Sequence, residues 1–286
     1  MSTLREKRKK EKRTKIRRMT TDWTVVGILM AVAVCCIGYL VWHNYSIHVQ
    51  ELEYERMRQQ EEVVSEETEM TEQVTETEEA ESTEDEKIYC EPVYDFEELE
   101  AENEDIYAWI VVPGTLVDYP VLQSETDNYY LDYNIDHTKG YPGCIYTNSC
   151  NQKDFSDYIT VLYGHNMKKG TMFGSLHRFE DENFFAEHDK IYVYTKDRRL
   201  TYTIRESVKF SDVYIPAEYP VNELAGRDAF LGDLEKYMDN RASHSREGVS
   251  VGDSDKIITL STCVNGERNR RYVVIGVLTE EAYYCE

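Results

Sequence analysis

The stretch "IITLSTCVNGERNRRYVVIGVL" (residues 257–278) places two apolar, β-branched runs on either side of a short polar loop. Such runs predict two neighbouring strands with a tight connection. Cys263 ends the first run, and Arg270 and Arg271 open the second. If the strands pair, the loop brings the guanidinium groups back toward the sulfur, where positive charge favours the thiolate. Cys263 is therefore a candidate nucleophile; the alternative is an inert thiol beside two solvated arginines.

The same strand pattern continues outward from this pair. "SDYITVLYGH" (156–165) is a β-branched and aromatic run that ends in a turn, and "KIYVYTKDRRLTYTIRESVKF" (190–210) alternates with period two on both sides of a hairpin signature. "RDAFLGDLEKYMDNRA" (227–242) spaces its apolar residues four apart, as in an amphipathic helix. Many strands, few helices and short connections predict a mainly β barrel or sandwich with accessory helices.

Charge is unevenly distributed along the 286 residues, which carry 55 acidic and 32 basic side chains. Residues 1–22 hold ten of the Lys and Arg, whereas the chain from residue 87 onward is net negative by 16, with 36 acids against 20 bases. Nucleic-acid binding needs clustered cations, so this composition argues against that class of function.

An uncharged segment, "WTVVGILMAVAVCCIGYLVW" (23–42), follows the basic residues. Its length suits the hydrocarbon core of a bilayer, and tryptophan favours both interfaces. The cations before it predict a cytoplasmic segment 1–22, a single transmembrane signal-anchor and an extracellular remainder. A cleavable signal peptide is the alternative, but no small-residue cleavage pattern follows the segment.

Residues 43–87 are rich in Glu and Thr, with sixteen acids between 51 and 86. We expect an extended, self-repelling extracellular spacer here, since so few apolar residues cannot offset ordering entropy. Its first part, 51–60, could instead continue the membrane helix. The composition becomes globular near residue 88, so 88–286 is predicted to form one globular domain.

His165 follows an apolar run and a glycine, which places it at a strand end. A cysteine and a histidine brought together would act as nucleophile and general acid–base in acyl transfer. A lone histidine is more often a surface or satisfied core residue. Of the five predicted extracellular cysteines, Cys144 could pair with Cys150 and Cys90 with Cys285, or all could be free. No metal-spaced cluster or cofactor fingerprint occurs, so we expect neither a metal nor an organic cofactor.

Four stretches of this sequence resemble segments of the sortases, the cysteine transpeptidases of Gram-positive cell surfaces. "TLSTC" (259–263) is similar to the signature around the family nucleophile, and "RYVVIGVL" (271–278) to the arginine that opens the next strand. "LYGHNMKKGTMFGSL" (162–176) and "DIYAWIVVPGTLVDYPVLQSETDNYYL" (105–131) resemble class B members. The resemblance implies an eight-stranded β-barrel with peripheral helices.

The resemblance also implies roles for three residues: Cys263 as nucleophile, His165 as acid–base and Arg271 as the cation that orients the substrate or oxyanion. The expected reaction cleaves a sorting signal of N-P-x-T-x or L-P-x-T-G type after its threonine, and passes the secreted protein to a peptidoglycan-precursor amine at the cell membrane. One alternative polymerises pilins with a lysine acceptor. Others are a thiol protease and a tethered binding module with a vestigial Cys/His pair.

Overall fold

The computed structural model describes residues 2–68 and 88–285, which divide into two compact units. One unit ends at Leu52 and the other begins at Glu53. Helix α1 (Ser2–Thr68) makes up the first unit and enters the second. Its part from Trp23 to Arg58 is long and apolar enough to cross a membrane. An N-terminal helix that could span a bilayer is therefore present, as the predicted signal-anchor requires.

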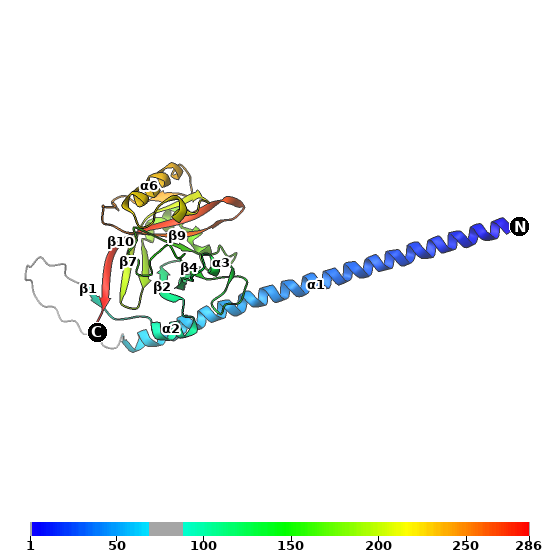
Figure 1. Cartoon of the computed structure of the whole chain (residues 1–286), viewed down its shortest axis with the longest axis horizontal. Coiled ribbons are helices and arrows are strands. Elements are labelled where there is room, and N and C mark those ends of the chain that lie inside the picture. The colour runs from blue at the N-terminus through cyan, green and yellow to red at the C-terminus, as the bar shows by residue number, and fades with distance from the viewer. Residues whose placement is uncertain (1, 69–87, 286) are drawn as a thin grey trace, which may run out of the picture. The chain divides into compact units, whose positions relative to one another are not determined.

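The second unit is built on one sheet of ten strands in the order β1-β10-β9-β5-β4-β3-β2-β6-β7-β8. A further pairing between β10 and β7 closes this sheet on itself, which leaves β1 and β8 outside a closed ring of eight strands in the part of the chain described. Figure 1 shows the long strands β7 and β10 side by side. The predicted eight-stranded barrel is confirmed. The strands are β1 (Ile88–Cys90), β2 (Ile106–Val112), β3 (Val117–Leu122), β4 (Ile145–Tyr146), β5 (Ile159–Tyr163), β6 (Lys190–Tyr194), β7 (Arg198–Ser211), β8 (His244–Ser245), β9 (Ile257–Val264) and β10 (Glu267–Tyr284).

Short helices fill the connections between these strands. The carboxylate of Asp95 begins α2 by accepting hydrogen bonds from the backbone N–H groups of Glu97 and Glu98 at 2.9 and 3.2 Å, which satisfies donors that have no partner in the helix itself. The helices of the domain are α2 (Phe96–Glu102), α3 (Tyr129–Asp132), η2 (Gly174–Glu180), α4 (Glu182–Glu187), α5 (Ile215–Glu218), α6 (Leu224–Leu234) and η3 (Glu235–Tyr237).

Two apolar clusters lie on opposite sides of the barrel wall. Side chains alternate between the faces of a strand, so Val274 of β10 joins the cluster inside the barrel while Val273 and Ile275 join a second cluster outside it. Phe230 and Leu234 of α6 cover this outer cluster, one helical turn apart, as their spacing predicts. Because both faces of β9 and β10 are buried, the strands read as continuous apolar runs.

The end of α1 packs against the barrel. Tyr54 and Met57 are each only 2% exposed and belong to the inner cluster. The hydroxyl of Tyr54 donates to the carbonyl of Gly143 at 3.0 Å, and its ring meets that of Tyr119 edge-on at 5.2 Å. These contacts hold the part of α1 that follows Glu53 against the rest of the second unit.

The structure shows the helical alternative left open for residues 51–60, and the helix extends further into the expected spacer, residues 43–87. Its residues up to Thr68 are helical, and those from Glu53 belong to the domain rather than standing apart from it. An ion pair of 2.7 Å between Arg56 and Glu102 adds to the apolar contacts. The acidic composition concealed two apolar residues three positions apart, which is enough to form a contact face on a helix. The remainder of the predicted spacer, 69–87, lies outside the described residues.

Candidate active site

Cys263 lies at the exposed end of an otherwise buried strand. Every residue of β9 from Ile257 to Thr262 is buried, whereas Cys263 is exposed. The strand therefore fixes the position of the backbone by packing, while leaving the thiol open to a substrate. A reactive rather than a buried structural cysteine needs this combination.

His165 is brought to the same end of the barrel by β5, which pairs with β9 in parallel. Tyr163 is opposite Ser261, and the next hydrogen bond runs from the Gly164 N–H to the Ser261 carbonyl at 3.2 Å. His165 lies two residues beyond Tyr163, and Cys263 two residues beyond Ser261. Parallel strands advance at the same rise per residue, so the chain at His165 leaves the barrel beside the chain at Cys263. The two predicted residues therefore lie at the same end of the barrel, at the ends of neighbouring strands.

Gly164 makes this approach sterically possible. A Cβ atom at this position would lie 2.5 Å from Cδ1 of Ile145 and 2.8 Å from ring atoms of Phe173. The hydroxyl of Thr262 also donates to the Gly164 carbonyl at 2.8 Å. The backbone before His165 therefore passes closely between two buried side chains and is held to β9.

The imidazole of His165 is walled in by the loop that precedes β4. The ring of Tyr141 meets it edge-on at 4.9 Å, and its Nδ1 atom is buried without a hydrogen bond of standard geometry among the described residues. Burial lowers the pKa of His165 below its usual value, and the Pro142 backbone and the Asp132 carboxylate oppose this shift without reversing it. The folded protein thus favours the neutral ring, which can accept a proton.

Arg271 and Arg270 point to opposite faces of β10. Arg271 is directly opposite Cys263 in the antiparallel β9–β10 pair, so the two side chains share a face. Its Nη1 atom donates to the carbonyl of Arg270 at 3.0 Å. The guanidinium of Arg270 instead lies 5.2 Å from the ring centre of Tyr237 in η3. The pairing therefore places the predicted Arg271, rather than its neighbour, on the face of the thiol.

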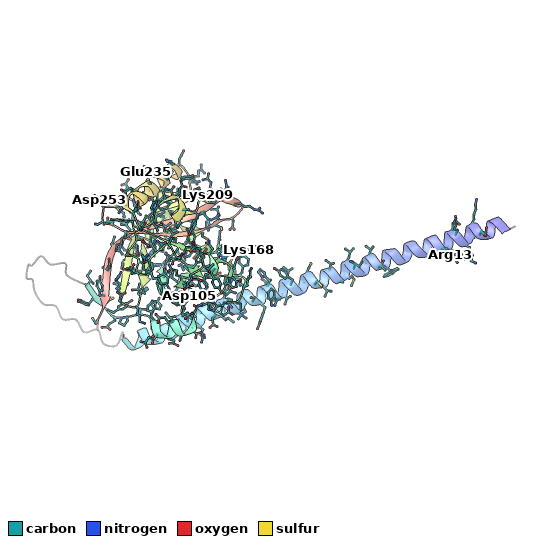
Figure 2. All side chains as sticks on the ribbon, in the orientation of Figure 1. Arg13, Asp105, Lys168, Lys209, Glu235 and Asp253 are labelled. Atoms are coloured by element: carbon teal, nitrogen blue, oxygen red, sulfur yellow. The ribbon has the colours of Figure 1, made fainter. Side chains whose placement is uncertain are left out.

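The loop between β9 and β10 is anchored near its tip. Lys209 of β7 forms a 2.6 Å ion pair with Glu267, and Gly266 adopts a positive φ of 80° at the turn. Lys168, three residues after His165, is exposed and lies at the edge of the domain (Figure 2). At this end of the barrel, the segment after His165 is therefore exposed at Lys168, whereas the β9–β10 connection after Cys263 is held by the Lys209–Glu267 ion pair.

Two further residues at the site were missed from the sequence. The side-chain Nδ2 of Asn166 donates to the carbonyl of Cys263 at 2.8 Å, and Nε2 of His177 lies 3.0 Å from the same oxygen. Asn166 could have been suggested by its place directly after His165. His177 gave no local signal, because only the folding back of η2 brings it to β9.

The cysteines considered for disulfides are free. Cys144 is buried, within 3.5 Å of the Tyr54 hydroxyl, and burial raises the pKa of its thiol to about 12. Cys150 instead lies 3.9 Å from the hydroxyl of Tyr214. Cys144 and Cys150 therefore lie in different surroundings and do not form the disulfide that their spacing allowed.

The comparisons with known proteins agree with this geometry. A family model described as "Sortase domain" matches residues 110–279, more than half of the chain. The chain belongs to the sortase family. Sortases are cysteine transpeptidases, and the matched region contains all three predicted site residues: His165, Cys263 and Arg271.

The similar proteins are class B sortases. Sortase B of Listeria monocytogenes is 32% identical over 173 residues, which cover 58% of this chain and 65% of that protein. Sortase B of Staphylococcus aureus is 28% identical over 266 residues, or 91% of this chain and 97% of that protein. Among solved structures, a Staphylococcus aureus sortase B–substrate complex has a TM-score of 0.62 and 25% identity, with 82% of this chain and 97% of that chain covered. Sortase B of Clostridium perfringens has a TM-score of 0.58 and 28% identity, with coverage of 65% and 100%.

Proposed function

We propose that this sortase cleaves a C-terminal sorting signal of N-P-x-T-x or L-P-x-T-G type after its threonine and transfers the secreted protein to a cell-wall amine. The observation that carries the proposal is the alignment of three strands, with Cys263 opposite Arg271 on one side and level with His165 on the other. A nucleophile, an acid–base and a fixed cation then meet at one exposed strand end, which is what acyl transfer requires.

In the proposed reaction, neutral His165 first takes the proton of the Cys263 thiol, and the resulting thiolate attacks the carbonyl carbon of the signal threonine. The negative charge on the resulting oxyanion is stabilised by the Arg271 guanidinium. His165, as imidazolium, gives its proton to the leaving amine, the C–N bond breaks, and a thioester to Cys263 remains. The acceptor amine then attacks this thioester and loses a proton to His165, and the new amide departs as the thiolate is restored.

The membrane segment supports the location of this reaction. The apolar part of α1 from Trp23 to Arg58 can span a bilayer, and ten cations precede it within residues 1–22. We propose a cytoplasmic N-terminus and an extracellular catalytic domain, following the positive-inside rule. Since the same helix continues into the domain at Glu53, a membrane anchor in α1 would tether the catalytic domain to the bilayer.

The test uses the full-length protein in detergent with fluorescence-quenched peptides that carry either signal, with and without an amine acceptor. We expect cleavage by the wild type, none by Cys263→Ala, and a product that shifts to the amine adduct when acceptor is added. Cleavage with no adduct at any acceptor concentration would indicate a thiol protease instead. A folded wild type that cleaves neither peptide would support the tethered binding module.

A pilin-polymerising sortase is the second candidate, and one comparison favours it. The structure of Spy0129, described as a Streptococcus pyogenes class B sortase involved in pilus biogenesis, has a TM-score of 0.57 and 25% identity to this chain. A lysine side-chain amine would then be the acceptor. Comparing a peptidoglycan-stem peptide with a lysine-containing pilin peptide as acceptor distinguishes the two, and we expect the stem peptide to be preferred.

A further inference from the structure

The carbonyl oxygen of Cys263 is held by side chains rather than by a neighbouring strand. Asn166 donates to it at 2.8 Å, and Nε2 of His177 lies 3.0 Å from it. Asn166 and His177 are also 2.9 Å apart, so the three groups form one cluster. Backbone carbonyls at a strand end commonly accept hydrogen bonds from water, whereas this one accepts a hydrogen bond from the segment that carries His165.

Glu180 contacts the His177 ring at the nitrogen that does not face Cys263. One of its carboxylate oxygens lies 2.5 Å from Nδ1 of His177. A carboxylate only accepts, so Nδ1 must carry a proton. Nε2 then either accepts from Asn166, whose other N–H goes to Cys263, or is itself protonated and donates directly to Cys263. In both arrangements a continuous chain of hydrogen bonds runs from Glu180 to the carbonyl.

The ring of His177 is itself fixed by packing. It stacks on Tyr272 of β10 with ring centres 5.0 Å apart and planes at 25°. The start of η2 passes very close to the Asn166 segment, because a Cβ at Gly174 would lie 2.6 Å from the Met167 carbonyl and 3.4 Å from Oδ1 of Asn166. The cluster is therefore built into the fold and does not depend on mobile surface side chains.

Resting on the function proposed above, we propose that Asn166, His177 and Glu180 form a clamp that positions the nucleophile through its carbonyl. Regular pairing of β9 with β10 is interrupted just beyond Cys263, with a register shift between Glu267 and Arg271. The peptide group is planar, so fixing the carbonyl of Cys263 limits backbone rotation at its Cα and so sets the direction of the Cα–Cβ bond that carries Sγ. These three are positioning residues, since they touch the backbone of Cys263 rather than the substrate.

The clamp also fixes the separation of the two catalytic groups. Asn166 directly follows His165, so the hydrogen bond from its side chain to Cys263 ties the acid–base to the nucleophile across β5 and β9. A misplacement of about 1 Å costs about a hundredfold in rate, even where every reacting group is present. Loss of the clamp should therefore lower the turnover of bound substrate more than it weakens binding.

The test compares two histidines that undergo the same substitution. His177→Phe keeps a ring to stack on Tyr272 and removes both nitrogen atoms. The matched control is His188→Phe: His188 also stacks on an aromatic ring, that of Phe184 at 3.9 Å, and also meets a backbone carbonyl, but that carbonyl belongs to Phe184. His177→Gln restores an amide donor near the position of Nε2. The full-length protein is used throughout.

We expect His177→Phe to lower kcat by about tenfold to a hundredfold with KM changed less than about twofold, while His188→Phe stays within about twofold of wild type. The rate of Cys263 alkylation by iodoacetamide should fall with kcat, and His177→Gln should recover most of both. Equal kcat and alkylation rates in the two phenylalanine variants would overturn the clamp. Failure of the proposed function is distinguishable, because the wild type would then turn over no signal peptide while the alkylation comparison still tests the clamp.

Discussion

Replacing Gly164 by alanine adds one methyl group at the point where β5 delivers His165. That methyl would lie 2.5 Å from Cδ1 of Ile145 and 2.8 Å from the ring of Phe173, far inside the usual carbon–carbon contact of about 3.5–4.0 Å. Ile145 and Phe173 are both fully buried, so neither can rotate away freely. Overpacking of this kind costs about 1–3 kcal/mol. The reduced freedom of the unfolded chain returns about 0.4–1 kcal/mol, for a net loss of about 0.6–2 kcal/mol.

Gly232→Ala is the matched control, because the same chemical change should have the opposite sign. Gly232 lies within α6, and no other atom lies within 4 Å of its added Cβ. Alanine in a helix interior is favoured over glycine by about 0.5–1 kcal/mol. Urea unfolding in detergent, followed by fluorescence of the fully buried Trp109, should show Gly164→Ala less stable and Gly232→Ala more stable than wild type.

Activity should separate the two glycine variants even more sharply. Displacing His165 from Cys263 lowers the rate of acylation, so Gly164→Ala should lose at least about tenfold in kcat/KM. Gly232→Ala lies on the outer side of the barrel wall and should keep wild-type activity. If Gly164→Ala were as stable and as active as wild type, the close passage of β5 between Ile145 and Phe173 would be contradicted.

Three further predictions follow from the site and the docked helix. Burial lowers the pKa of His165 in the folded state, so between that pKa and about 6.5 the unfolded state binds more protons than the folded state. The stability of wild type relative to His165→Gln should therefore fall as pH is lowered from 7 to 5 in urea titrations. A stability difference that does not change with pH would contradict this. Met57→Ala should cost about 2–5 kcal/mol of unfolding free energy, since the side chain is buried in an apolar cluster of the domain, and a cost under about 0.5 kcal/mol would show that the helix does not dock. Arg271→Ala should lower kcat by about 10²–10³, whereas Arg270→Ala should mainly lose a cation–π contact of about 0.5–1 kcal/mol in stability; equal kcat losses would contradict the assignment of faces.

Much of the fold was readable from local pattern. Period-two alternation around "KDRR" predicted the hairpin of β6 and β7, and the apolar spacing of Phe230 and Leu234 predicted the packing face of α6. Closure of the barrel was not readable from alternation alone, because the β7–β10 pairing joins segments far apart in the chain. That prediction came instead from the resemblance of four stretches of the sequence to a known family.

In the candidate site too, local pattern identified some residues, and others became apparent only from the folded structure. Cys263 and His165 were found because each ends an apolar run, which marks the point where a strand leaves the core. Arg271 was selected over Arg270 by resemblance, and strand register supplies the physical reason, since neighbouring residues face opposite sides. His177 was not selected from the sequence, because nothing in its own segment shows which strand lies beneath it. Tyr54 was overlooked because its surroundings are acidic.

The central claim, that Cys263 is the nucleophile, is tested most directly by mass spectrometry of the acylated enzyme. The full-length protein is mixed with a sorting-signal peptide in the absence of acceptor, quenched in acid, and digested. We predict an added mass equal to the peptide up to and including its threonine, on Cys263 alone among the seven cysteines, and its loss when an amine is supplied. An adduct on another cysteine, or turnover of the peptide by Cys263→Ala, would contradict the account.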